Sequence, residues 1–84
     1  MRANSIIKIK YKRNLDNVND RKILRLKGAI IREKFTDVIY IEDQDEENYV
    51  SSFIVDSSVK VNVIAFITDY LNRESINEIV EILQ

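Results

Sequence analysis

The chain has 84 residues, which is the size of one small domain, and its net charge is −1. It contains no cysteine and no histidine, a single glycine and no proline. These absences exclude a disulfide framework, metal sites of thiolates or imidazoles, histidine-dependent catalytic triads and glycine-rich phosphate loops. We therefore expect one non-catalytic domain over residues 1–84, with no catalytic residues, no metal and no cofactor.

Hydrophobicity along the chain gives no indication of a membrane protein. The N-terminal residues lack an apolar signal region, and the longest apolar run, Val63 to Ile67, is far too short to span a bilayer. A secreted domain of this size would also usually need disulfides. We expect a cytoplasmic protein, in a cell or in a host cell infected by a virus, with no membrane partner.

The two parts of the chain carry opposite charge. Residues 1–34 hold 11 Lys or Arg against three acidic residues, a balance of +8, whereas residues 35–84 hold two basic against 11 acidic residues, a balance of −9. Such asymmetry predicts either a charged partner or two complementary faces within one fold.

Alternating residues indicate a hairpin in the first third of the chain. Between Ser5 and Arg13, apolar residues and lysines alternate, which is typical of a half-buried strand. A cluster of turn-forming residues follows at 14–20. Alternation then resumes over residues 21–30, with Gly28 as a candidate bulge. We predict two strands that pair with each other.

Two further strands are expected in the middle of the chain. Residues 37–42 form a short apolar run with an acidic end, and residues 49–55 form a longer one. The acidic segment 42–48 between them has the composition of an exposed turn. These segments predict a second hairpin.

Helical spacing dominates the last third of the chain. Val59, Val63, Phe66, Ile67 and Tyr70 form a helical stripe, although the alternation of the valines in this segment leaves a fifth strand open. Ser75 and Glu78 have the spacing of a capping box, followed by apolar residues at helical intervals. We predict a helix over the first segment and a second helix after Ser75.

The predicted fold class is α+β, a four-stranded antiparallel sheet with two C-terminal helices on one face, in the order ββββαα. If the segment from Val59 to Ile67 is a strand instead, a five-stranded SH3-like or OB-like barrel with a C-terminal helix results. The ββββαα order is similar to that of several small phage-encoded inhibitors, an analogy of architecture alone.

The first candidate site is cationic. On the predicted hairpin, six basic side chains point the same way and would neutralise an anionic partner such as a nucleic acid: Lys8, Lys10, Lys12, Arg21, Arg25 and Lys27. No aromatic residue alternates with them to stack on bases. The alternative interpretation is that these lysines and arginines protect an edge strand or face an acidic surface of the same protein.

The second candidate is an acidic surface that could contact a basic groove on a partner: Glu42, Asp43, Asp45, Glu46 and Glu47. Asp43, Asp45 and Glu47 also have the alternation of a calcium loop. They lack the glycine at its sixth position and the glutamate at its twelfth. An exposed acidic turn is the interpretation that we favour.

The third candidate is an apolar set on the predicted third and fourth strands: Ile39, Ile41, Val50 and Ile54. If these residues lie on the uncovered face of the sheet, they indicate a protein interface or a homodimer. If the register of the strands differs, they belong to the core.

Together these features favour a small non-catalytic binding module that acts on a macromolecular partner, in a regulatory or inhibitory role. The alternative is a nucleic-acid-binding protein that uses the basic face of the first hairpin.

Overall fold

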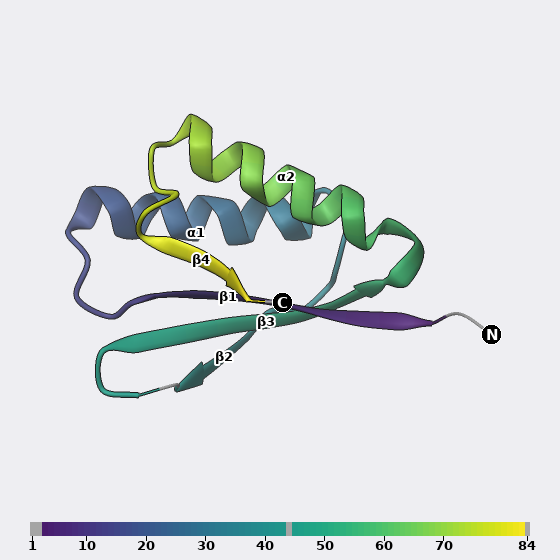
Figure 1. Cartoon of the computed structure of the whole chain (residues 1–84), viewed down its shortest axis with the longest axis horizontal. Helices are drawn as coiled ribbons and strands as arrows, with labels where there is room; N and C mark the ends of the chain where they lie inside the picture. Colours follow the sequence, from purple (N-terminus) through teal and green to yellow (C-terminus); the bar gives the residue numbers. More distant parts are fainter. Residues whose placement is uncertain (1–2, 44, 84) are drawn as a thin grey trace.

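The computed structural model describes residues 3–43 and 45–83, except for the side chain of Asp43. Its elements follow one another as β1 (Asn4–Lys12), α1 (Asn17–Arg32), β2 (Tyr40–Asp43), β3 (Asn48–Asp56), a single 3₁₀ turn (Ser57–Val59), α2 (Lys60–Arg73) and β4 (Val80–Leu83). Figure 1 shows these elements along the chain.

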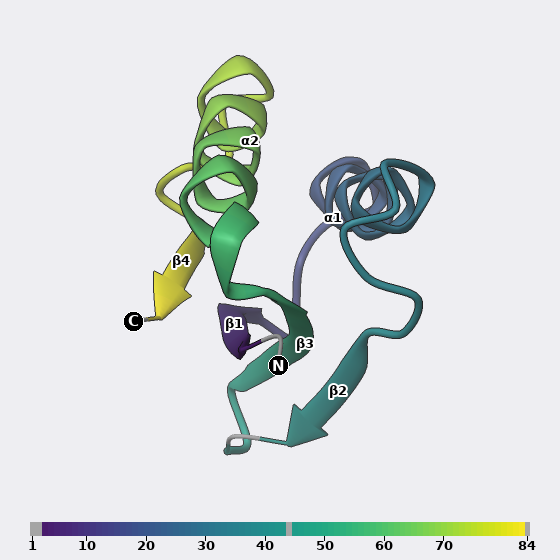
Figure 2. The same cartoon turned by 90° about the vertical axis from the view of Figure 1, so that its right-hand side faces the viewer.

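The four strands form one antiparallel sheet in the order β2-β3-β1-β4. Both helices lie on the same face of this sheet, and the opposite face has no helix over it (Figure 2). The element order βαββαβ is that of the ferredoxin-like, or split βαβ, arrangement. The helix α1 connects β1 to β2, which are parallel and separated by β3, and α2 connects β3 to β4, which are parallel and separated by β1. Because such connections are right-handed, both helices lie on the same side of the sheet.

The α+β class, the four-stranded antiparallel sheet and the two helices are therefore confirmed, but the order ββββαα is wrong. The alternative five-stranded barrel does not form, because the segment after Val59 is helical and the sheet of described residues has four strands.

The predicted second strand, residues 21–30, is the helix α1. Ile23, Leu26 and Ile30 are buried at helical spacing, and the apparent alternation came from Leu24, which is 58% exposed. Asp16 caps the helix by accepting a hydrogen bond from the backbone N–H of Asn19. The first predicted hairpin therefore does not exist, and β1 pairs instead with β3 and β4.

The predicted final helix after Ser75 is also absent from the described residues. Ser75 has a φ of 58° and ends α2, where the backbone N–H of Ile76 donates to the carbonyl of Leu71. The chain then passes through a tight turn into β4, which pairs with β1. Glu78 is exposed in that turn and makes no capping box with Ser75.

Four other predicted elements are confirmed within a few residues. The first predicted strand is β1, and the two middle strands are β2 and β3, which pair as a hairpin. The helix predicted after Val59 is α2. The helical stripe of that segment buries Val63, Ile67 and Tyr70 as its spacing predicted.

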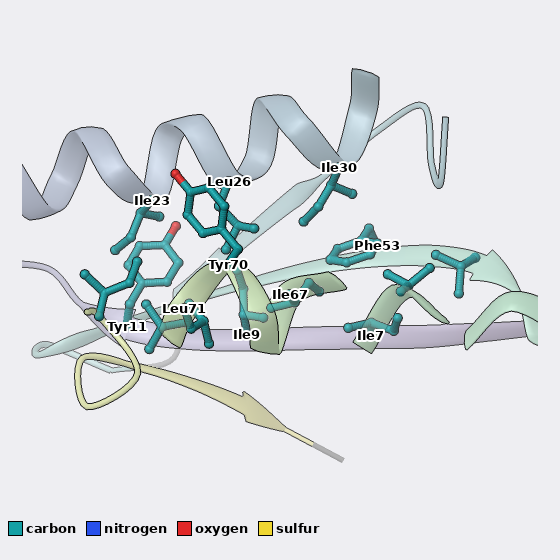
Figure 3. Packing of buried hydrophobic residues seen from close by; sticks show 14 residues of the cluster. Ile7, Ile9, Tyr11, Ile23, Leu26, Ile30, Phe53, Ile67, Tyr70 and Leu71 are labelled. Carbon is teal, nitrogen blue, oxygen red and sulfur yellow. The ribbon is translucent and has the colours of Figure 1, made fainter. Parts of the chain in front are cut away.

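The core lies between the helices and the sheet (Figure 3). Alternate residues of β1 and β3 point into it, and they meet the apolar stripes of the two helices. The largest contributors are Ile7, Ile9, Tyr11, Phe53, Ile23, Leu26, Ile30, Ile67 and Ile76, each at most 5% exposed. Burial of an aliphatic or aromatic side chain of this size stabilises the fold by about 1.5–3 kcal/mol relative to leaving it exposed.

The two helices are also joined directly by polar contacts. The hydroxyl of Tyr70 on α2 donates to the carbonyl of Lys22 on α1 at 2.9 Å, and the ammonium of Lys22 donates to the carbonyl of Glu74 at 2.8 Å. Burial, followed by the nearby charge of Glu74, raises the pKa of Tyr70 above its ordinary value. The pair of contacts fixes the helices side by side above the sheet.

Among the residues described, neither helix has the length and apolar composition needed to cross a membrane.

Candidate interaction surfaces

The sheet surface turned away from the helices is called the open face below. Strand alternation and register define its members: Ile6, Lys8, Lys10 and Lys12 of β1, Tyr40 and Glu42 of β2, Val50, Ser52 and Ile54 of β3, and Glu81 and Leu83 of β4. The core residues Ile7, Ile9 and Tyr11 alternate with the lysines of β1 and point to the helices.

An apolar band crosses all four strands of the open face, and its members on β1, β2 and β3 are exposed. Ile6 lies directly opposite Ile54, and their side chains are 59% and 48% exposed. Tyr40, which is 59% exposed, lies on the neighbouring strand β2 opposite Ser52, one position along from Ile54 on the same face. Leu83 on β4, which is half-buried, lies opposite Lys8 and extends the band to the other edge of the sheet. The apolar band thus consists of Tyr40, Ile54, Ile6 and Leu83.

The lysines of β1 lie beside this band, as the alternation predicted, but glutamates accompany them. Lys8 pairs with Glu42 at 3.6 Å, with both side chains about half exposed. Lys10 lies directly opposite Glu81 on β4, a favourable cross-strand pair. The three lysines are therefore balanced by two glutamates on the same face, and the open face has only a small positive charge.

The structure does not bring the six predicted basic residues to one face. Arg21, Arg25 and Lys27 belong to α1, on the other side of the sheet from Lys8 and Lys10, because residues 21–30 are helical. Arg21 and Arg25 are exposed, whereas Lys27 is half-buried. The prediction of a single cationic face is therefore wrong, because it assumed a second strand where the chain forms α1.

Lys27 contributes to a polar network at the edge of the core. Its ammonium donates to the hydroxyl of Tyr11 and lies 4.8 Å from the centre of that ring. The Tyr11 hydroxyl also shares a 2.9 Å hydrogen bond with the buried hydroxyl of Ser51. Arg13 lies over the neighbouring ring of Tyr49 at 4.3 Å.

A groove of about 280 Å³ lies between α1 and the ends of β1, β2 and β3, and it is lined by Tyr11, Arg13, Lys27 and Tyr49 together with Lys12, Asp20, Ile23, Leu24 and Ile41. The volume is at the lower limit of small-molecule sites. Arg13 and Lys27 already lie over the rings of Tyr49 and Tyr11, so the cations of the groove are engaged in contacts of the fold itself.

The predicted acidic residues lie on β2 and in the turn that follows it. Glu42 is on the open face, Asp43 pairs with Tyr49 through its backbone, and its side chain lies outside the described residues. Asp45, Glu46 and Glu47 are exposed.

Asp45 has a structural role in this turn. Its carboxylate accepts the backbone N–H groups of Glu47 and Asn48, each at 2.8 Å, and the side-chain amide of Asn48. The hydrogen bond from Glu47 is the largest cause of a lowered pKa of Asp45, and the charge of Lys10 adds to it. Within the described residues, no group of three or more acidic side chains is placed to hold a metal ion.

The four predicted interface residues are divided between surfaces. Val50 and Ile54 share the open face, but Val50 is only 1% exposed. Ile39 packs against the core, and Ile41 lies on the helix side of β2, where it lines the groove. Ile54 is thus the one predicted member of the exposed band.

Sequence reasoning missed the other members of the band. Ile6 precedes the lysines in the same alternation and could have been assigned to their face. Tyr40 and Leu83 could not, since their faces depend on the register of β2 and on the existence of β4.

Comparison with known proteins gives no match to a family model, to a curated protein or to a solved structure. The βαββαβ arrangement does not select a function, because it supports many unrelated ones. The surfaces themselves must carry any functional assignment.

Proposed function

We propose that this protein is a non-catalytic binding module that binds another protein with its open face, in a regulatory or inhibitory role. One observation carries the proposal: the face without helices bears an apolar band across four strands, with Ile6, Ile54 and Tyr40 about half exposed or more. Apolar side chains that are contiguous on an otherwise charged surface mark interaction sites.

The composition of the open face fits the anatomy of protein interfaces. Such interfaces have an apolar centre in which tyrosine is enriched, and a polar rim. Here Tyr40, Ile54 and Ile6 form the centre, and charged residues of both signs lie beside them: Lys8, Lys10, Lys12, Glu42 and Glu81. A rim of mixed charge favours a protein partner with a complementary pattern over a uniformly charged polymer.

The open face is a poor match for single-stranded nucleic acid. Sheets that bind RNA present aromatic side chains on their central strands, where bases stack. The central strands here carry Lys8 and Lys10 on β1 and Val50 and Ser52 on β3. Because Lys8 is paired with Glu42, the lysines also offer less positive charge than the sequence indicated.

The proposal is tested with a double variant, Ile6→Lys with Ile54→Lys, which places two charges in the centre of the band. Both side chains are exposed, so the variant is expected to fold, and circular dichroism checks this. Val61→Lys is the matched control, because Val61 is 78% exposed but lies on α2, away from the open face. Wild type and control should retain the same protein from nuclease-treated lysate, and the double variant should lose it.

Retention of the same proteins by all three forms would contradict the proposal. A second copy of the chain is the other occupant that the experiment must separate. Sedimentation at about 100 µM reports it: a dimer abolished by the double variant would make the open face a self-association surface, and the regulatory role would then be abandoned.

A further inference from the structure

The surface of α1 that points away from the sheet carries a row of arginines. Arg21, Arg25 and Arg32 are all exposed. At about 100° per residue they fall within about 40° of one another around the helix, and they span about 16 Å along it. The buried residues of α1, Ile23, Leu26 and Ile30, lie on the opposite side of the helix. These three residues are called the arginine row.

The arginine row contributes little to the fold: the charge of Arg25 opposes the rise in the pKa of Tyr70 on α2, but burial and Glu74 outweigh it. None of the three guanidinium groups forms a hydrogen bond or an ion pair with another described residue, in contrast to Lys22 and Lys27 of the same helix. The acidic residues of α1 and its C-cap, Asp20 and Glu33, lie at other angles around the helix. Three like charges on one side of a helix repel one another, so the row costs stability unless an anion neutralises it.

Gly28 lies in the same row, between Arg25 and Arg32. A glycine inside a helix is less stable than alanine by about 0.5–1 kcal/mol. Its φ is not positive, and a Cβ atom added at Gly28 would meet nothing within 4 Å. Neither the backbone nor internal packing requires a glycine here. What its lack of a side chain does provide is room for a molecule to approach the backbone of α1 from outside.

We propose that the arginine row binds the phosphate backbone of a nucleic acid, with Gly28 as the point of closest approach. The guanidinium group forms paired hydrogen bonds with phosphate, and arginine is the preferred residue for such contacts. A linear row of charges matches a polymer of regularly repeated phosphates better than it matches a single anionic group. The inference concerns the side of the molecule opposite the open face, and it does not rest on the proposed protein partner.

The test is fluorescence anisotropy of a labelled 20-base-pair duplex and a labelled 20-nucleotide single strand between 50 and 200 mM salt. Three phosphate contacts give a slope of log affinity against log salt of about −2.7 for duplex and about −2.1 for single strand. Affinity should therefore fall by about 40-fold for duplex, or about 20-fold for single strand, over this range.

Substitutions locate the binding surface. Arg25→Gln should weaken binding for every sequence and make the slope less steep by about 0.7–0.9, and Arg21→Gln and Arg32→Gln should do the same. Lys10→Gln is the matched control, since it removes the same charge from the open face. Gly28→Gln leaves the charge unchanged, and it should weaken binding while raising the melting temperature.

Several results would overturn the inference. Absence of binding at 50 mM salt would do so, as would an equal loss on Lys10→Gln, because binding would then follow net charge or the open face. Poly-glutamate or vesicles with 30% anionic lipid serve as competing polyanions. If either binds through the same arginines as tightly as the duplex, the row is a site for acidic protein or membrane and the nucleic-acid assignment fails.

Discussion

Lys27 on α1 donates a hydrogen bond to the hydroxyl of Tyr11 on β1, the strand at the centre of the sheet between β3 and β4. The same hydroxyl is bonded to Ser51, which is completely buried. A single tyrosine thus connects a helix, the central strand and the core.

Replacement of Tyr11 by phenylalanine should lower the free energy of unfolding by about 1–2 kcal/mol, measured by urea denaturation. The reason is that the buried hydroxyl of Ser51 loses its partner, which costs more than an average hydrogen bond contributes. Tyr40→Phe is the control, because its ring is exposed, and it should change stability by no more than about 0.5 kcal/mol. In the double variant Tyr11→Phe with Ser51→Ala, part of the loss should be recovered, and strict additivity would refute the network.

Replacement of Gly28 by alanine should raise the free energy of unfolding by about 0.5–1 kcal/mol, since the helix gains propensity and the new methyl group meets no neighbour. Thermal denaturation measures this change. Ala65→Gly, at an exposed position inside α2, is the reverse substitution and should lower stability by a similar amount. A loss of stability on Gly28→Ala would show that the fold needs the glycine.

Ser75 adopts a left-handed backbone conformation, with a φ of 58°. This conformation costs a residue with a Cβ atom about 1 kcal/mol, so replacement of Ser75 by glycine should stabilise the protein by about that amount. Ser75→Ala keeps the Cβ atom and should give no such gain. Urea denaturation of the two variants compares them directly, and equal stabilities would argue against backbone strain at this position.

The turn between β2 and β3 should loosen in acid through Asp45. The folded structure lowers the pKa of this carboxyl, mainly through the backbone hydrogen bond from Glu47. Its contribution to stability is therefore complete above the ordinary aspartate pKa and is lost as the pH falls through the lower folded value. An NMR titration should show the amide resonances of Glu47 and Asn48 moving with the Asp45 carboxyl.

Asp45→Asn keeps a hydrogen-bond acceptor but removes the ionisation, so these amide resonances should no longer titrate in acid. If they move over the same pH range in the variant, a different carboxyl controls the turn.

Parts of the fold were predictable because a local pattern had only one interpretation. In β1, lysines separate Ile7, Ile9 and Tyr11 at every second position, and only a strand places such residues on opposite faces. The segment of α1 had two interpretations. Leu24 and Leu26 alternate, but Ile23, Leu26 and Ile30 are the residues that tertiary packing buries, and Asp16 served as an N-cap although its neighbourhood resembled a turn.

The candidate surfaces were less predictable, because they depend on pairing between distant segments. Ile6 meets Ile54 across 48 positions of the sequence, and no local pattern indicates that contact. The sequence placed Lys8 and Lys10 correctly on one side of a strand. It could not place Glu42 beside Lys8, because that position depends on the register of β2. It could not place Glu81 beside Lys10 either, because Ser75 and Glu78 have the spacing of a helix start just before β4.

The position of β1 at the centre of the sheet has a consequence for how the protein folds. Its partners come much later in the chain, so that Ile9 pairs with Ser51 on one side and with Ile82 on the other. Long sequence separation between partners slows folding, because the entropy cost of closing the loop arises before the stabilising contacts form. Until then β1 has two unpaired edges and is exposed to pairing with other chains. Lys8, Lys10 and Lys12 keep the unfolded segment charged during this interval, which protects it from aggregation before its own partners arrive.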